Sequence, residues 1–228
     1  MEELSYDREA LARDHAVYVS KFNDEQRHVY DSIIQSVDSG SGEVFFVYGS
    51  GGTGKTFMWS SLSAVILCRG EIVLNVASSG IASLLLLGGR TTHSRFKIPI
   101  NVTEDSFCCI KQGSSLAELI VRTKLIIWNE APMMHKYCFE ALDRNLRDLM
   151  RCSNQRSPDL PFGGITDVFC GDFRQILPVI LKCSRQDVVN GTIYIWDYCK
   201  VLSLTKNMRL LNVDSGTKSL ELVNFLNG

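Results

Sequence analysis

Apolar residues gather along the chain in short runs that are separated by longer segments of mixed polarity. The runs are rich in β-branched and aromatic side chains, which is typical of strands buried on both faces. They occupy residues 43–48, 71–76, 124–128, 165–170 and 201–204. Because strands of this kind alternate with helices in parallel sheets that are covered on both faces, we expect an α/β fold.

Helical signals fill several of the segments between these runs. Asn23 is a good N-cap residue, and Gln26 follows it at the spacing of a capping box. Gly70 marks the end of a second helix, and a single apolar stripe runs through the segment after residue 134. The expected helices lie at residues 23–37, 55–69, 80–87, 135–151 and 213–227, and residues 152–164 are expected to form a polar loop.

Composition narrows the class of protein. The 228 residues suit one large domain or at most two small ones, and 45% apolar with 21% charged residues is the balance of a globular chain. A net charge of -1 excludes nucleic-acid binding through bulk charge, so any such binding needs a local basic patch. No apolar run approaches the ~18 residues of a membrane span, and the charged N-terminus excludes a secretory signal. We therefore expect a soluble intracellular protein.

The eight cysteines do not form a recognisable framework. They are scattered along the chain without a C-x-x-C pair, and we expect them to be reduced thiols. His135 and Cys138 could share a helix face, but two ligands do not make a zinc site.

A glycine-rich segment follows the first expected strand and opens the second expected helix. It fits the pattern G-x-x-x-x-G-K-S/T of a phosphate-binding P-loop. Glycines let backbone N–H groups turn toward an anion, and the helix N-terminus adds its partial positive charge. We expect a nucleoside triphosphate to be bound by Gly49, Ser50, Gly51, Gly52, Thr53, Gly54, Lys55 and Thr56. Lys55 would reach the β- and γ-phosphates, and Thr56 would offer its hydroxyl to Mg²⁺.

A second candidate site follows the strand expected at residues 124–128. Glu130 lies where a carboxylate that orients the attacking water would be needed, and Asn129 stands where an Asp would hold Mg²⁺. Asn keeps a carbonyl oxygen but lacks the charge, which at ~4 Å and an effective dielectric of about 20 is worth up to ~4 kcal/mol. Weaker Mg²⁺ binding is therefore our hypothesis. The same segment also fits a helix-initiating turn with Pro132 near its start, and both readings can hold together.

Six segments together resemble the petite-integration-frequency (Pif-type) group of superfamily-1 DNA helicases, and within it the plant and Helitron-like members. They are Phe22–Gln26, Ser50–Thr56, Ala77–Ala82 with Gly88–Phe96, Trp128–Met133, Gly171–Pro178 and Leu204–Arg209. The resemblance runs from about residue 22 to residue 209. It implies a P-loop NTPase with a RecA-like parallel sheet, ATP and Mg²⁺ as cofactors, and single-stranded DNA or DNA forks as partners.

The resemblance also implies roles for individual side chains. Gln26 would read the adenine, Glu130 would polarise the attacking water, Gln175 would sense the γ-phosphate, and Arg209 would stabilise charge that develops there. For Gln26, Gln175 and Arg209, the sequence alone also allows another role. Gln26 fits the capping box, Gln175 could be a hydrogen-bonding loop residue, and Arg209 could be a solvated basic residue.

A basic segment without acidic residues extends from residue 90 to residue 103. Positive charge interleaved with an aromatic ring suits a groove that follows phosphates and stacks a base, although a solvated loop would have the same composition. The resemblance adds Ser79 to this set. The expected DNA-binding residues are Ser79, Arg90, His93, Arg95, Phe96 and Lys97.

The leading hypothesis is an ATP-dependent 5′–3′ DNA helicase that serves repair, recombination and telomere maintenance in the nucleus, or in the mitochondrion. The resemblance implies an N-terminal extension at residues 1–21, a first motor domain at 22–212 and a helix at 213–228 that leads toward a second motor domain. Too few residues follow to form that domain, so we expect the first motor domain alone. The alternative is a weakened module that binds nucleotide and single-stranded DNA, and a P-loop kinase is disfavoured by the Gln175 and Arg209 segments.

Overall fold

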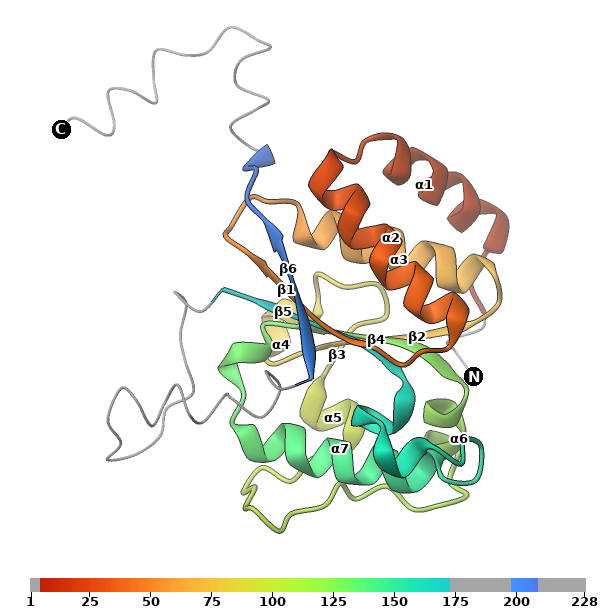
Figure 1. Cartoon of the computed structure of the whole chain (residues 1–228), viewed down its shortest axis with the longest axis vertical. Coiled ribbons are helices and arrows are strands. Elements are labelled where there is room, and N and C mark those ends of the chain that lie inside the picture. The colour runs from red at the N-terminus through yellow and green to blue at the C-terminus, as the bar shows by residue number, and fades with distance from the viewer. Residues whose placement is uncertain (1–4, 173–197, 209–228) are drawn as a thin grey trace, which may run out of the picture.

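A six-stranded sheet forms the centre of the computed structural model, which describes residues 5–172 and 198–208 (Figure 1). The strand order is β3-β2-β4-β5-β1-β6, and every neighbouring pair is parallel. The strands are β1 (Val44–Gly49), β2 (Ile72–Ala77), β3 (Arg90–Thr91), β4 (Thr123–Asn129), β5 (Thr166–Gly171) and β6 (Cys199–Leu204). The expected α/β class with a parallel sheet is confirmed.

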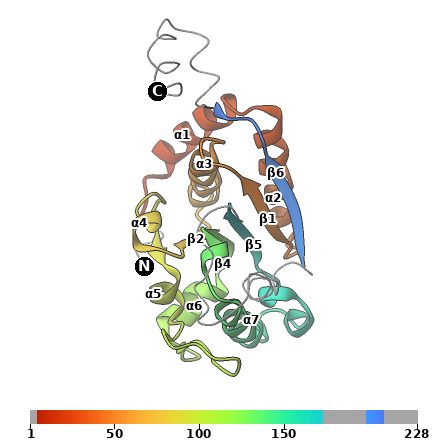
Figure 2. The same ribbon diagram turned by 90° about the vertical axis from the view of Figure 1, so that its left-hand side faces the viewer.

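Helices cover both faces of this sheet, as the two perpendicular views show (Figures 1 and 2). On one face lie α1 (Arg8–Ser20), α2 (Asp24–Ser39) and α3 (Lys55–Cys68). On the other lie α5 (Thr92–Phe96), α6 (Ser115–Val121) and α7 (Lys136–Met150). Alternate residues of a strand enter opposite cores: on β4, Leu125 and Ile127 pack toward α2 and α3, while Ile126 and Trp128 pack toward α7.

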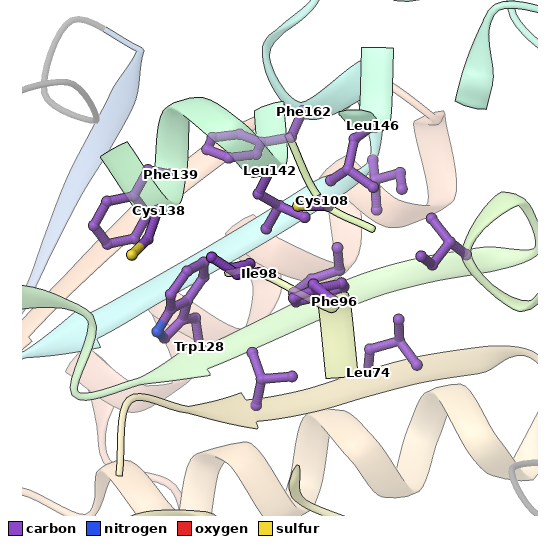
Figure 3. Close-up of a cluster of buried hydrophobic side chains, with 14 of the residues drawn as sticks. Leu74, Phe96, Ile98, Cys108, Trp128, Cys138, Phe139, Leu142, Leu146 and Phe162 are labelled. Atoms are coloured by element: carbon purple, nitrogen blue, oxygen red, sulfur yellow. The ribbon is translucent and has the colours of Figure 1, made fainter. Parts of the chain in front are cut away.

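Aromatic side chains fill the core beneath α7 (Figure 3). The ring of Trp128 lies 4.6 Å from that of Phe139 and 5.6 Å from that of Phe169, and Phe162 lies 5.3 Å from Phe169. Aromatic rings bury large apolar areas and favour tilted or edge-on pairs, which is the geometry found here. This core fixes Trp128 near the end of β4, directly before Asn129 and Glu130.

The strongest helix signals are confirmed to within two residues. The capping box of α2 is complete, since Gln26 N donates to Asn23 Oδ1 at 2.9 Å and Asn23 N donates to Gln26 Oε1 at 3.2 Å. His135 is the N-cap of α7, and Arg151 is its C-cap. The expected polar loop at residues 152–164 contains two short 3₁₀ turns, Ser157–Asp159 and Pro161–Gly164.

The helix expected at residues 80–87 is wrong in length, because α4 spans only Gly80–Ser83. Beyond it the chain tightens: Leu85 N donates to Ala82 O and Leu86 N to Ser83 O, both three residues back. Such i→i−3 bonds end an α-helix. The leucines that suggested a longer helix do not form one buried stripe, since Leu84 and Leu85 are exposed and Leu86 is buried.

Three helices were not expected from the sequence: α1, α5 and α6. Asp7 caps α1 through Glu9 N and Ala10 N, but none of the α1 side chains is fully buried. Tertiary contacts hold α1 instead: the Tyr18 ring packs edge-on against Phe57 of α3 at 5.2 Å. The α5 and α6 helices have five and seven residues, too short to show a clear helical period.

Some expectations fall outside the described residues. They are the roles of Gln175 and Arg209 and the helix at residues 213–227. Within residues 5–172 and 198–208, no helix has the length and apolar character needed to cross a bilayer.

Asp167 is an acidic residue in the middle of β5, where it is 1% exposed. Among residues 5–172 and 198–208, neither of its carboxyl oxygens has a hydrogen-bond partner. Burial, with a smaller contribution from Asp143, raises the pKa of Asp167 well above its ordinary value. The folded protein therefore binds this proton more tightly than the unfolded chain does.

We predict that Asp167→Asn removes part of the pH dependence of stability. In the wild type, the favourable contribution of the protonated carboxyl is present below the unfolded pKa near 3.8 and is lost as pH rises toward the higher folded pKa. The Asn side chain cannot ionise, so the Tm of the variant should exceed that of the wild type by a margin that widens between pH 4 and pH 7. Thermal unfolding across this range measures the margin. The exposed Asp148→Asn serves as control, and a margin independent of pH would contradict the assignment.

Candidate nucleotide-binding site

The P-loop connects the end of β1 to the start of α3. Gly52 and Gly54 have φ of 87° and 83°, a region in which side chains other than glycine are strained. Gly54 is the N-cap of α3, so the backbone N–H groups that follow it have no side-chain cap. Thr53 closes the turn by donating its hydroxyl to Ser50 O at 2.9 Å. The loop has the backbone shape that an anion cradle requires.

Lys55 extends along the inside of this loop. Its ammonium group donates to the backbone carbonyl oxygens of Gly49 and of Ser50, the latter at 3.0 Å. Burial lowers the pKa of Lys55, while Cys170, Asp172 and Glu130 act in the opposite direction. The two carboxylates therefore help to keep the ammonium charged, which is the form that attracts phosphate.

Gln26 joins α2 to the P-loop. Its side-chain oxygen accepts from Asn23 N in the capping box, and its Nε2 donates to Thr53 O at 3.1 Å. The residue is 1% exposed. A Cβ added at Gly54 would collide with the same amide group. The capping-box alternative is confirmed, whereas reading of adenine by Gln26 stays a prediction.

The segment that follows β6 also contacts the loop. Met208 N donates to Gly52 O at 2.9 Å, and a Cβ added at Gly52 would lie 2.6 Å from Asn207 Oδ1. Glu25 of α2 accepts from Thr205 N at 2.8 Å and from Lys206 N at 3.2 Å. These contacts bring the residue before Arg209 to the P-loop.

A cavity of about 470 Å³ opens in front of the loop. Its walls come from the P-loop, from the ends of β4 and β5, and from the segments around Leu85 and Met208. The lining residues are Gly51, Gly52, Gly54, Lys55, Thr56, Phe57, Leu85, Asn129, Glu130, Gly171, Asp172 and Met208. The structure thus brings the P-loop and the segment of Asn129 and Glu130, which are far apart in the sequence, to the same cavity.

Asn129 lies at the end of β4 and is 8% exposed. Its Oδ1 accepts from the thiol of Cys170 at 3.1 Å. Burial raises the pKa of Cys170 to about 12, so the thiol keeps its proton and remains a donor. The Asn129 carbonyl is therefore oriented by β5 at the edge of the cavity.

Glu130 has φ of 57°, in the left-handed region. Two serines at the end of β2 hold it: Ser78 Oγ donates to Glu130 O at 2.7 Å, and Ser79 Oγ donates to Glu130 Oε2 at 3.0 Å. Trp128 Nε1 donates to Ser78 Oγ at 3.0 Å and ties this arrangement to the aromatic core. Ser79 was expected to contact DNA, and its contact with Glu130 was not expected.

Asp172 is a cavity residue to which the sequence analysis gave no role. It directly follows β5, as Glu130 directly follows β4, and it is 9% exposed. An acidic residue just after a buried strand, at the edge where parallel strands end, was the available signal.

The expected DNA-binding residues do not all share a surface. Phe96 is fully buried in the core beneath α5, so the expectation that its ring stacks on a base is wrong for this structure. Arg95 is 6% exposed and belongs to the interior as well. The helix α5 turns both side chains inward, a feature that the linear pattern of charges does not reveal. Arg90 and Lys97 are exposed, and His93 is partly exposed with Nδ1 3.1 Å from Ile98 O.

This geometry defines a P-loop NTPase domain, and comparison with known proteins gives its family. Residues 21–227 match the model of the PIF1-like helicase family, to which the chain belongs. The chain is 28% identical over 186 residues to the ATP-dependent DNA helicase PIF4 of Trypanosoma brucei brucei, with 79% of this chain and 21% of the relative covered. It is 32% identical over 174 residues to the ATP-dependent DNA helicase RRM3 of Saccharomyces cerevisiae, with 72% and 23% covered.

Solved helicase structures have the same fold. The crystal structure of Bacteroides Pif1 bound to ssDNA superposes with a TM-score of 0.65 at 26% identity, covering 90% of this chain and 45% of that one. The complex of Bacteroides Pif1 with ADP-AlF3 and ssDNA gives 0.64 at the same identity and coverage. The chain thus spans about a fifth of these two curated relatives and just under half of these structural neighbours.

We predict that Gln26→Ala weakens the P-loop and lowers its affinity for nucleotide. Both ends of the Gln26 amide are engaged by protein atoms, so the variant loses buried hydrogen bonds and about 1–3 kcal/mol of stability. If Gln26 acts only through these hydrogen bonds, the affinities for ATP and GTP should fall by the same factor. Thermal unfolding and titration with both nucleotides test this, with the exposed Gln35→Ala of the same helix as control. A loss confined to ATP would show instead that Gln26 reads adenine.

Proposed function

We propose that this chain is the ATP-binding motor domain of a DNA helicase, which hydrolyses ATP in response to single-stranded DNA. The observation that carries the proposal is the shared cavity, in which Lys55 of the P-loop faces the segment of Asn129 and Glu130. Family membership supports it, because relatives with similar sequences are named ATP-dependent DNA helicases.

The residues of the cavity support hydrolysis of the bond to the γ-phosphate. The P-loop N–H groups and Lys55 would bind and orient the phosphates. Glu130 would accept the proton of the water that attacks phosphorus, while ADP leaves with the electron pair of the broken P–O bond. Gln175 and Arg209 remain candidates for contact with the γ-phosphate.

The oxygen atoms at the cavity suit Mg²⁺, a cation that prefers oxygen ligands and keeps several waters. The Thr56 hydroxyl, the Asn129 Oδ1 and the Asp172 carboxylate would hold it together with phosphate oxygens. When bound, Mg²⁺ would neutralise charge on the phosphates. No group of three or more His, Cys, Asp or Glu side chains that could hold a metal occurs within the described residues, consistent with a site completed by the nucleotide.

Exposed basic residues near the carboxyl edge of the sheet support a path for single-stranded DNA or the arm of a fork. Arg90 and Lys97 would contact phosphates. Ser79 follows β2 and His93 lies in α5, on the same stretch of chain. The polarity of movement, 5′ to 3′, rests on the resemblance alone. So do roles in repair, recombination and telomere maintenance, and a place in the nucleus or mitochondrion.

The neutral Asn129 favours a second candidate function, a module that binds nucleotide and single-stranded DNA but hydrolyses ATP slowly. We predict that Asn129→Asp tightens Mg-ATP binding by about tenfold, because it adds a charge beside the dication. With EDTA the same change should weaken ATP binding, since the carboxylate then repels the phosphates. Calorimetric titration in both conditions checks this reversal of sign.

The DNA-stimulated hydrolysis rate of the wild type and of Asn129→Asp separates the two candidates. Hydrolysis by both favours the helicase motor, whereas hydrolysis by the Asp variant alone identifies the natural chain as the weakened module. Lys55→Ala is the negative control and should lose on the order of a hundredfold in affinity for ATP. If neither chain hydrolyses ATP even when joined to a second motor domain, the enzymatic proposal is wrong.

We also predict that Arg90→Ala and Lys97→Ala weaken binding of single-stranded DNA. Each lost phosphate contact should reduce the slope of log affinity against log salt by about 0.7. Fluorescence anisotropy with a labelled oligonucleotide at several salt concentrations measures the slope. Arg122→Ala and Lys124→Ala, exposed matches near the opposite edge of the sheet, should leave it unchanged. Equal effects of both pairs would indicate attraction by overall charge only.

A further inference from the structure

Two consecutive serines contact different parts of Glu130, one its backbone and the other its side chain. Ser78 fixes the backbone: its N–H donates to Asn129 O at 3.1 Å, and its hydroxyl donates to Glu130 O at 2.7 Å. Trp128 Nε1, in the fully buried indole, donates to that same hydroxyl. With the backbone held in this way, only rotation about its side-chain bonds can move the Glu130 carboxylate.

Ser79 fixes the side chain. Its hydroxyl donates to Glu130 Oε2 at 3.0 Å and is the only hydrogen-bond partner of that carboxylate among residues 5–172 and 198–208. The same Oγ accepts from Ala82 N at 3.2 Å as the N-cap of α4. The carboxylate of Glu130 is therefore coupled to α4 through one hydrogen bond.

The short helix α4 and the residue that follows it expose large apolar side chains instead of packing them against the rest of the domain. Ile81 and Leu84 are 82% and 83% exposed, and Leu85 reaches from this segment to the wall of the cavity. Its buried residues are Ala82 and Ser83, and Ala82 joins the core beneath α2 and α3. A shift of α4 would thus displace the Ser79 hydroxyl without disturbing the aromatic core that holds Trp128.

We propose that Ser79 is a positioning residue that holds Glu130 in a resting orientation and releases it when single-stranded DNA binds. The inference rests on the proposed function. A hydroxyl group has one proton, and a carboxylate and a phosphate are both strong acceptors for it. If a DNA phosphate takes the Ser79 proton, Glu130 loses its only described donor, and its oxygen becomes available to the attacking water. Binding of DNA and release of Glu130 are then one exchange of hydrogen bonds.

The exchange predicts that Ser79→Ala uncouples hydrolysis from DNA. Without the Ser79 hydroxyl, the Glu130 carboxylate is free in the absence of DNA, so the DNA-independent hydrolysis rate should rise by at least about threefold. The ratio of stimulated to unstimulated rate should fall by the same factor. Ser79→Thr retains a hydroxyl and should restore the wild-type ratio.

A double-mutant cycle gives a second readout that does not depend on hydrolysis. In the exchange, Glu130 competes with DNA for the Ser79 proton. Glu130→Ala should therefore raise the affinity for single-stranded DNA by a larger factor in the wild type than in Ser79→Ala. Equal factors in both backgrounds would reflect only the removal of a negative charge, and they would overturn the proposal.

Ser114→Ala is the matched control. Ser114 caps α6 by accepting from Ala117 N at 3.2 Å, the distance found for Ser79, but it makes no hydrogen bond to Glu130. If Ser79→Ala changes hydrolysis no more than Ser114→Ala does, or lowers the rate with and without DNA alike, the exchange is wrong while the proposed function stands. If the wild type neither hydrolyses ATP nor binds single-stranded DNA, the proposed function fails, and the exchange fails with it.

Discussion

Parallel pairing of the central strands is the constraint on which the site depends. Because β1, β2, β4 and β5 run in one direction, their carboxyl ends meet at one edge of the sheet. The P-loop leaves β1 there, Ser78 leaves β2, Asn129 ends β4, and Asp172 follows β5. A strand shifted by one residue would also turn its core side chains to the wrong face, so the packing of Leu125 and Ile126 into opposite cores fixes this alignment.

The charges at the cavity compensate one another. Lys55 lies where burial disfavours its charge, and Asp172 and Glu130 oppose that effect. An Asp at position 129 would add a third carboxylate, but Asn129 keeps only an oriented carbonyl, held by the buried thiol of Cys170. The remaining negative charge thus comes from the residues that follow β4 and β5. If Glu130 orients the attacking water, Asp172 is the carboxylate at the cavity that remains for cation binding.

Much of the fold was predictable because its signals are local. Buried strands, the Asn23 capping box and the glycine pattern of the P-loop each depend on residues close in sequence. The predictions that failed concern features that depend on tertiary packing. The helix α1 is held by contacts such as that of Tyr18 with Phe57. The leucines after α4 have the sequence pattern of a buried helix face, but Leu84 and Leu85 are exposed. Phe96 and Arg95 show the same limit, because a basic and aromatic composition does not reveal which side chains a short helix turns inward.

Individual site residues were predictable to the extent that their chemistry matched a motif, but their connections were not. Gln26 is both a capping residue and a support of the P-loop, and these roles share one amide group, so neither excludes the other. Ser79 likewise caps α4 and holds Glu130 with one hydroxyl. In both cases a single polar group both caps a helix N-terminus and contacts a segment that lines the cavity. A movement of α2 or α4 therefore cannot leave the cavity unchanged, because the hydrogen bonds that begin these helices also hold the P-loop and the Glu130 side chain.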